Sequence, residues 1–181
     1  MSDRNLWRYG ATYPVVLPRA TGFALARGDL CYFDVTVLSD VRVEAPTGSQ
    51  GVVKSAAGYP SQGSTLATQQ GFAALFVGVN AQRWPLAGNV PPIFGGQDGL
   101  LRINTGGVFE FDKAPGAVFQ VGNLVAPDVA SAPGGALLPQ QVALVSGKAG
   151  AIGRVERFSD GGQSTVWVRI FSAYFAPLTN A

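Results

Sequence analysis

The second half of the chain is a series of short β-type segments separated by glycine turns. After Gly106-Gly107, these segments are Val108-Phe109-Glu110-Phe111, Gly122-Asn123-Leu124-Val125, Ile152-Gly153-Arg154-Val155 and Thr165-Val166-Trp167-Val168-Arg169-Ile170. Alternating apolar and polar residues between such turns are typical of strands. Asp160-Gly161-Gly162 separates residues 152–158 from residues 164–171, which predicts a β-hairpin. We therefore expect an all-β fold, a small β-barrel or β-sandwich with long inserted loops.

The composition indicates a binding surface. Only 13% of the 181 residues are charged and 47% are hydrophobic, and the charged share is about half of that in common soluble proteins. A surface with so few charges suggests that much of it is covered by a partner. Ten of the thirteen basic residues are Arg, which suits directed pairing at contacts. The net charge of +2 gives no strong attraction to nucleic acid.

The absence of histidine and the single cysteine exclude several kinds of site. A disulfide within the chain is impossible, and Cys31 lies in an apolar run that predicts a core residue. Metal sites of the Cys and His type and His-dependent catalytic triads lack their residues. We expect no enzyme activity, no cofactor and no metal. A hydrolase that uses Glu110 and Asp112, two acids on one side of a strand, is the least favoured alternative.

Residues 1–20 are rich in Arg, aromatic residues and proline, and we interpret them as an extended N-terminal arm. The alternative is an ordinary first strand within the chain's own sheet. Five side chains are predicted to contact a neighbouring subunit or a partner: Arg4, Trp7, Arg8, Tyr9 and Tyr13. No apolar leader follows the N-terminus and no stretch is long enough to span a bilayer, so we expect a soluble protein.

Residues 21–181 are predicted to form a single β domain. From Leu30 to Glu44 apolar residues such as Cys31 and Phe33 alternate with polar residues such as Asp34, which predicts half-buried β structure with one solvent-exposed face. The alternative is a hairpin that turns at Ser39-Asp40. Residues 45–99 change to Ala, Gly, Ser, Gln and Thr and read as a partly irregular inserted lobe. Within them, residues 71–79 predict a buried strand, with a short helix as the alternative.

Two features of the sequence have more than one interpretation. Residues 28–35 align with residues 122–129, and because both begin with a glycine turn, we favour convergent turn chemistry slightly over duplication. Arg154, Arg157 and Arg169 could cluster across the final hairpin, and Trp167 could offer a stacking surface for a base. Glu156 and Asp160 lie between them, so an ordinary solvated or intersubunit face is favoured over a nucleic-acid site.

The order of the glycine-separated segments resembles that of bacteriophage capsid cement proteins, also called head decoration proteins. In that family a strand similar to Gly107-Val108-Phe109-Glu110-Phe111 leads into a Lys-Ala step, here Lys113-Ala114. A turn similar to Gly122-Asn123-Leu124-Val125 follows, where the family more often has Asp. Residues 152–155 and 165–170 resemble its later strands. The resemblance covers residues 100–171, with a looser match at residues 22–35, and residues 45–99 depart from it.

The resemblance implies a virion structural protein on the capsid exterior, synthesised in the host cytoplasm. Its partners would be the major capsid protein of a phage head and further copies of itself, most often as a homotrimer. Direct binding to nucleic acid or to a membrane is not expected. The alternative function is a β-sandwich carbohydrate-binding module, in which Trp84, Tyr59 and Trp7 would be exposed platforms for sugar rings.

Overall fold

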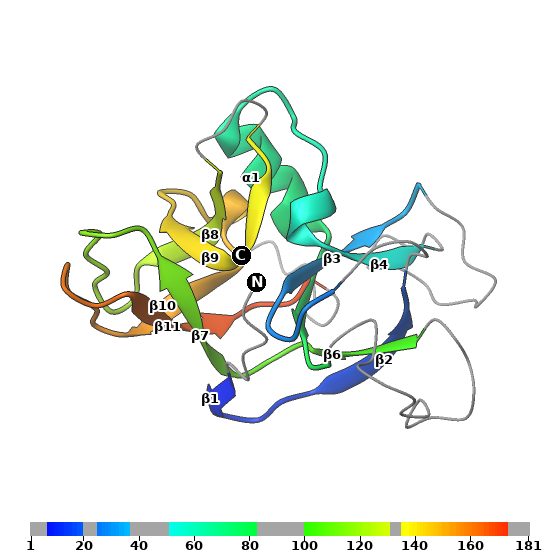
Figure 1. The fold of residues 1–181 in the computed structure, drawn as a ribbon, viewed down its shortest axis with the longest axis horizontal. Helices are drawn as coiled ribbons and strands as arrows, with labels where there is room; N and C mark the ends of the chain where they lie inside the picture. The colour runs from blue at the N-terminus through cyan, green and yellow to red at the C-terminus, as the bar shows by residue number, and fades with distance from the viewer. Residues whose placement is uncertain (1–6, 20–24, 37–50, 83–99, 131–134, 174–181) are drawn as a thin grey trace.

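The computed structural model describes residues 7–19, 25–36, 51–82, 100–130 and 135–173. These residues form mainly strands arranged in two sheets, which confirms the all-β prediction. Figure 1 shows the two sheets side by side, with helix α1 (Thr65–Ala74) above them. The first sheet contains β2 (Pro14–Pro18), β3 (Leu30–Asp34), β4 (Val52–Ser55), β5 (Phe76–Asn80) and β6 (Leu100–Asn104). The second contains β1 (Trp7–Tyr9), β7 (Val108–Lys113), β8 (Leu124–Val129), β9 (Leu137–Leu144), β10 (Gly153–Arg157) and β11 (Thr165–Ile170).

Each sheet closes into a five-stranded barrel. In the second sheet the order is β7-β11-β10-β8-β9, and β9 returns to β7 through a parallel pairing that includes Lys113 and Val142. In the first sheet the order is β2-β6-β5-β3-β4, and a parallel bridge between Arg19 and Val53 joins β4 to β2. Five strands that otherwise alternate in direction need one parallel pair to close, because their number is odd. We call β2–β6 the first barrel and β7–β11 the second barrel.

The two barrels are structural repeats. Their strands follow one another along the chain in the same order and occupy the same positions in the sheet. In the first barrel Cys31 pairs with Gly78 on one side, and in the second Val125 pairs with Gly153. Residues 14–35 align with residues 108–129 without a gap. Short 3-10 turns, η1 (Ala56–Gly58) and η2 (Lys148–Gly150), follow the third strand of each repeat.

The turn that suggested a repeat in the sequence has the same geometry in both barrels. Gly28 and Gly122 have φ angles of 93° and 87°, a conformation that favours glycine. The side chains of Asp29 and Asn123 each accept a hydrogen bond from the backbone N–H three residues earlier, at 2.9 and 2.8 Å. The slight preference for convergent turn chemistry is therefore wrong, because the correspondence extends through all five strands and their registers.

A glycine in the fourth strand of each barrel allows a close approach of the fifth strand. A Cβ atom at Gly153 would lie 2.4 Å from the carbonyl oxygen of Arg169, and one at Gly78 would lie 2.2 Å from that of Asn104. Real Cβ atoms do not approach backbone oxygens so closely, so any side chain would push the strands apart.

We predict that Gly153→Ala lowers the free energy of unfolding by about 1–3 kcal/mol, because the added methyl group must displace the backbone of β11. Gly147→Ala is the matched control, because a Cβ atom there meets nothing within 4 Å. Urea denaturation of both variants checks this prediction. Equal stability of the two variants would contradict the close approach of β10 and β11.

The first barrel has its own apolar interior, and the second barrel shares its interior with the contact between barrels. The first interior comprises Leu17, Leu25, Cys31, Phe33, Val53, Val77, Leu101 and Ile103. Cys31 is fully buried, as predicted, and burial raises the pKa of its thiol. The other cluster combines Leu30, Tyr32 and Phe72 with the inward residues of the second barrel, such as Phe111. Gln140 also donates a 2.9 Å hydrogen bond to the buried Asp29, which joins β9 to the first repeat.

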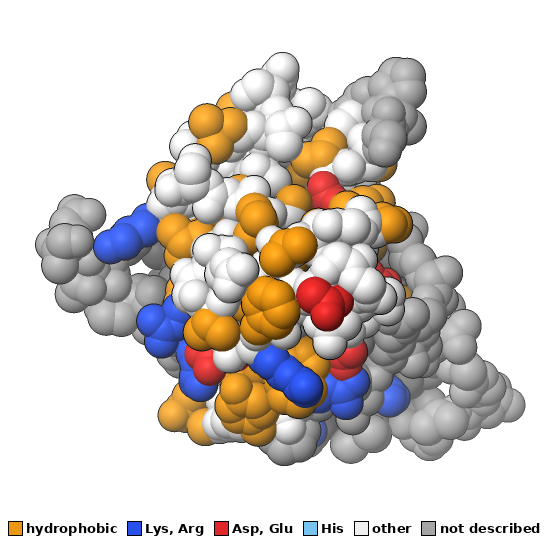
Figure 2. Space-filling view, turned by 90° about the vertical axis from the view of Figure 1, so that its left-hand side faces the viewer, with side chains coloured by type: hydrophobic (Ala, Val, Ile, Leu, Met, Phe, Trp, Pro, Cys, Tyr) orange, Lys and Arg blue, Asp and Glu red, His pale blue; other side chains and the backbone are white. Residues whose placement is uncertain are grey.

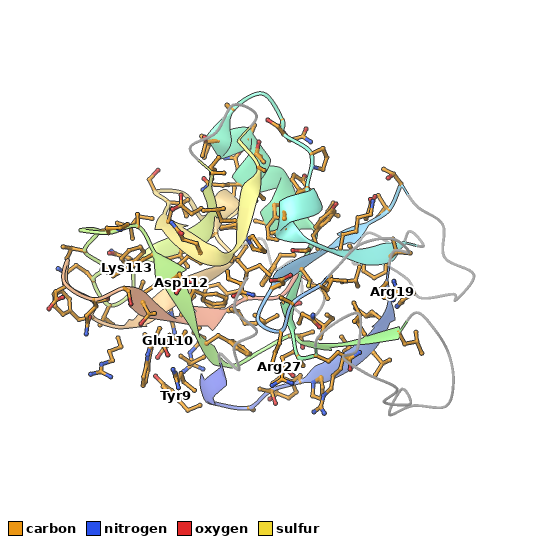
Figure 3. The ribbon with its side chains drawn as sticks, viewed as in Figure 1. Tyr9, Arg19, Arg27, Glu110, Asp112 and Lys113 are labelled. Atoms are coloured by element: carbon orange, nitrogen blue, oxygen red, sulfur yellow. The ribbon has the colours of Figure 1, made fainter. Side chains whose placement is uncertain are left out.

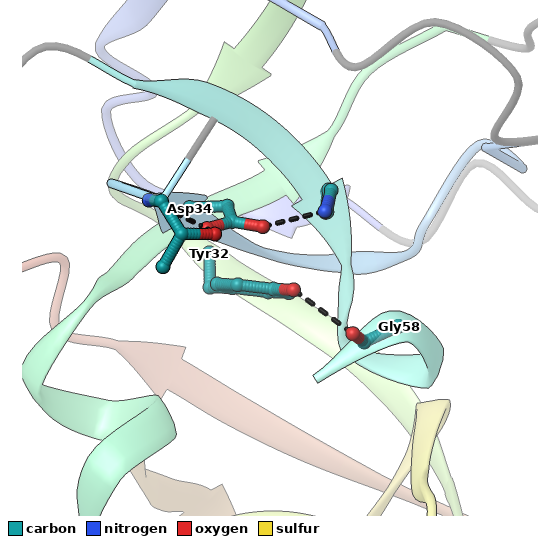
Figure 4. Close-up of polar contacts among 5 residues, drawn as sticks. Tyr32, Asp34 and Gly58 are labelled. Atoms are coloured by element: carbon teal, nitrogen blue, oxygen red, sulfur yellow. Dashed lines mark hydrogen bonds and ion pairs between the residues drawn. The ribbon is translucent and has the colours of Figure 1, made fainter. Parts of the chain in front are cut away.

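The prediction of a solvent-exposed face is wrong for β3, and residues 37–44 of that prediction lie outside the described residues. All five residues of β3 are buried, because the outer side packs under η1 and α1. The Tyr32 hydroxyl donates a 3.0 Å hydrogen bond to the Gly58 carbonyl (Figure 4). Burial opposes ionisation of Asp34, but hydrogen bonds from Lys54 and Thr36 outweigh it and lower the pKa of Asp34.

The prediction of an inserted lobe at residues 45–99 is also wrong for residues 51–82, because β4 and β5 are integral strands of the first barrel. The helix alternative applies to residues 71–74, and the strand begins at Phe76. Among residues 100–130 and 135–173, helix α1 has no counterpart. Ser64 caps its N-terminus by accepting a hydrogen bond from the Ala67 N–H, and Gln69 donates to the Pro127 carbonyl of β8 at 2.9 Å. The helix therefore fastens the two barrels together.

Lys113, part of the Lys-Ala step, lies inside the structure. Its ammonium group donates to the carbonyl oxygens of Ala117 and Asp160 and lies 5.7 Å from the ring centroid of Phe119. The side chain thus ties the turn after β7 to the β10–β11 hairpin. Arg19 occupies the corresponding position in the first barrel, where the same parallel closure occurs.

We predict that Lys113→Met destabilises the protein by about 2–4 kcal/mol, because hydrogen bonds to a charged group contribute about 1.5–3 kcal/mol each. The exposed Lys148→Met is the control. Thermal and urea unfolding of the two variants check this. A Lys113→Met protein as stable as the control would show that the buried ammonium does not hold the hairpin.

Candidate functional site

Arginine and aromatic side chains gather on the outer side of the second barrel. Strand residues alternate between the two faces of a sheet, so the neighbours of the inward-facing Val166 and Val168 point outward. We call this surface the arginine–aromatic face. Its members are Arg8, Tyr9, Glu110, Arg154, Glu156, Arg157, Trp167, Arg169 and Phe171. Figure 2 shows basic and hydrophobic side chains next to one another on the lower part of this side of the molecule.

Trp167 lies at the centre of the face. The guanidinium carbon of Arg157 lies 5.0 Å from the centroid of its ring, and that of Arg8 lies 5.8 Å away. The ring of Tyr9 is tilted by 58° against it at 6.0 Å. A cation over an aromatic face is attracted by the ring quadrupole. These contacts hold long arginine side chains in defined positions before any partner arrives.

Ion pairs connect strand β1 to the barrel. Arg8 pairs with Glu110, and Glu110 also accepts a 2.5 Å hydrogen bond from the Thr165 hydroxyl. In Figure 3, Tyr9 and Glu110 lie near one another below β7. The Tyr9 hydroxyl donates to Glu156 at 3.4 Å. The N-terminal strand thus shares its charged contacts with β7 and β10.

Glu156 links two further arginines. Its Oε1 atom lies 2.5 Å from Nε of Arg169 and 3.9 Å from Nε of Arg154. The hydrogen bond from Arg169 is the main cause that lowers the pKa of Glu156, and the same bond raises the pKa of Arg169. Arg154 also lies over the ring of Phe171, at 5.9 Å from its centroid.

The face carries an excess of positive charge. Its four arginines and two glutamates leave a net charge of +2. Arg157 contacts Trp167, and no acid among the described residues forms an ion pair with it. The excess guanidinium charge is therefore available to a partner.

The structure places the predicted contact residues as follows. Arg8 and Tyr9 belong to the face, and Tyr13 is 63% exposed beside Gly106. Arg4 and the side chain of Trp7 lie outside what is described. Residues 7–9 and 14–18 are strands paired with β7 and β6, so the arm prediction is wrong there and the alternative, a strand of the chain's own sheets, is correct. Whether these side chains contact a neighbouring subunit stays a prediction.

The sequence indicated half of this surface. Arg154, Arg157 and Arg169 do share one side of the hairpin that the sequence predicted, where Arg157 lies over Trp167 and Arg154 and Arg169 meet at Glu156. The sequence did not show that Arg8 and Tyr9 join them. The signal available for this was the β-prone Trp7-Arg8-Tyr9 triplet, but nothing in it identifies β7, about 100 residues later, as its partner.

Two alternatives lose support, the aromatic platforms of a carbohydrate-binding module and the acid pair of a hydrolase. Tyr59 is buried edge-to-face against Tyr32 and Phe72, so it is no platform for a sugar ring. Trp84 lies outside the described residues. The carboxylate of Glu110 is engaged by Arg8 and Thr165, as described above. The residues that the structure describes contain no group of three or more potential metal ligands.

Comparison with protein-family models, with curated proteins and with solved structures finds no match for this chain. Within the described ranges no helix has the length and hydrophobicity required to cross a membrane.

We predict that Glu156→Gln makes the protein less stable at pH 7 and that this difference shrinks in acid. A carboxylate with a lowered folded-state pKa stabilises the protein above its unfolded pKa of about 4.3. That contribution is lost as the pH falls through the lowered pKa that Glu156 has in the folded protein. Urea unfolding of both proteins at pH 7, 5 and 3 measures the difference. A difference that stays constant down to pH 3 would argue against the Arg169 pairing.

Proposed function

We propose that this protein is a virion structural protein that binds the outside of an assembled phage head and stabilises the shell by bridging its subunits. The observation that supports this proposal best is that the segment resembling cement proteins, residues 100–171, contains one complete closed barrel. That barrel also carries the arginine–aromatic face. In this proposal the protein acts as a homotrimer, and its partner is the major capsid protein.

The chemistry of the face suits attachment. Arg, Trp and Tyr are the residues that most often anchor protein interfaces. Here they project from the strands of a packed barrel and are held by ion pairs and ring contacts, so binding orders few additional side chains. A filled head pushes its shell subunits apart. An interface of about 800 Å² per partner, repeated around a symmetry axis, opposes this expansion through avidity.

The proposal includes no reaction. A carbohydrate-binding module is less well supported, because the buried Tyr59 removes one of its three platforms. The trimer follows from the family resemblance and from the match between closed oligomers and shell symmetry axes.

We predict that the purified protein cosediments with expanded phage heads that lack it and raises the temperature at which they break. Deleting residues 1–12 should weaken binding by about tenfold or more, because it removes Arg8 and Tyr9 from the face. The five strands of the second barrel still close without β1. Cosedimentation and thermal disruption of heads provide the measurements. Undiminished binding of the truncated protein would contradict the role of these residues, and absence of binding by the intact protein would contradict the function.

A further inference from the structure

We propose that the arginine–aromatic face binds an acidic segment of the shell protein, a surface strand or loop that carries at least two carboxylates. This inference rests on the proposed function and identifies the chemistry of the partner. The carboxylates would pair with Arg157 and Arg154, and apolar atoms of the segment would contact the exposed parts of Tyr9 and Phe171.

The first barrel shows that the fold does not require this face. Trp167, which is paired with Glu110, corresponds to Arg102, which is paired with Val16. Arg169 corresponds to Asn104, which occupies the same position in the fifth strand. The first barrel closes with the same strand order and register without the central tryptophan and its arginines. The cluster therefore serves something other than barrel formation.

The available charge lies at two positions of the face. Arg157 is exposed and its guanidinium lies over the ring of Trp167. The N–H groups at the edge of the guanidinium can therefore form a bidentate pair with a carboxylate. The Arg154 side chain is 54% exposed and shares Glu156 with Arg169, which makes the shorter contact. Two guanidinium groups therefore remain for the carboxylates of a partner, because the described residues of the face supply two glutamates for four arginines.

A protein segment fits this face better than a nucleic acid does. Glu110 and Glu156 lie among the arginines and would repel the phosphates of duplex DNA, which carries one negative charge per about 1.7 Å of helix axis. Single carboxylates can be placed between those glutamates. The alternation of charge with aromatic surface is also typical of protein interfaces.

The test uses the intact protein, a double variant with Arg154→Glu and Arg157→Glu, and a double control with Arg102→Glu and Lys148→Glu. Arg102 and Lys148 are exposed and lie outside the face, so the control makes the same change of net charge away from it. Binding to expanded heads is measured at 50 and 300 mM salt. We expect the intact protein to bind about tenfold more weakly at the higher salt, since exposed ion pairs are screened. We expect the double variant to bind at least about a hundredfold more weakly than the control, consistent with the loss of charge-assisted contacts.

A second measurement decides the inference independently of head binding. Fluorescence anisotropy compares a labelled ten-residue peptide rich in Glu with a twenty-nucleotide single-stranded DNA, each added to the three proteins. We expect the peptide to bind the intact protein and the control, and to lose binding to the double variant. Equal peptide binding by all three proteins, or tighter binding of the DNA to the same arginines, would overturn the inference. Intact protein that binds the peptide but not heads would instead refute the proposed function alone.

Discussion

The parallel pairing that closes each barrel is the constraint on which the rest of the structure depends. An odd number of strands leaves two neighbours running in the same direction, and Lys113 with Val142 supplies that contact in the second barrel. Closure fixes the register of every other strand, and register decides which side chains enter the core. Phe109, Phe111 and Val168 consequently point inward, while Glu110 and Trp167 point outward beside one another.

The two repeats put the same framework to different uses. In the first barrel the outer side of β3 carries Leu30 and Tyr32 and is buried in the cluster shared with the second barrel. Helix α1, which only the first repeat contains within the described residues, reaches across to β8 and completes this contact. The second barrel keeps its β10–β11 side exposed, with charges and aromatic rings at positions where the first barrel has Val79 and Arg102. The first barrel thus supports the second barrel, which presents the arginine–aromatic face.

The sequence was sufficient where the signal is local. The hairpin around residues 160–162 and the buried Cys31 each follow from periodicity or a turn within a few residues. It was insufficient where the answer depends on distant packing. The alternation of apolar and polar residues after Leu30 predicted a solvent-exposed face, but it carries no information on which elements cover that face.

The repeat was hard to recognise for a related reason. Its interior tolerates volume-compensating exchanges, such as the larger Phe111 in place of Leu17 and the smaller Val168 in place of Ile103, so the two halves share few identities. The short segment after the turn glycine remained alike enough to notice, because Gly28, Leu30, Asp34 and Val35 recur as Gly122, Leu124, Asp128 and Val129.

The proposed role of the arginine–aromatic face depends on a further physical condition, the ordering of its arginine side chains. A free arginine loses about 2 kcal/mol of rotamer entropy when a contact fixes it. On this protein Arg8 and Arg157 already lie against the faces of Trp167, and Arg169 is held by Glu156. Part of the entropic cost is therefore met during folding. Glu110 and Glu156 position the cations, and because they are fewer than the arginines, the surface stays attractive to acidic groups. A rigid barrel with an ordered and incompletely neutralised face is suited to adhesion, since its affinity comes from groups already in place.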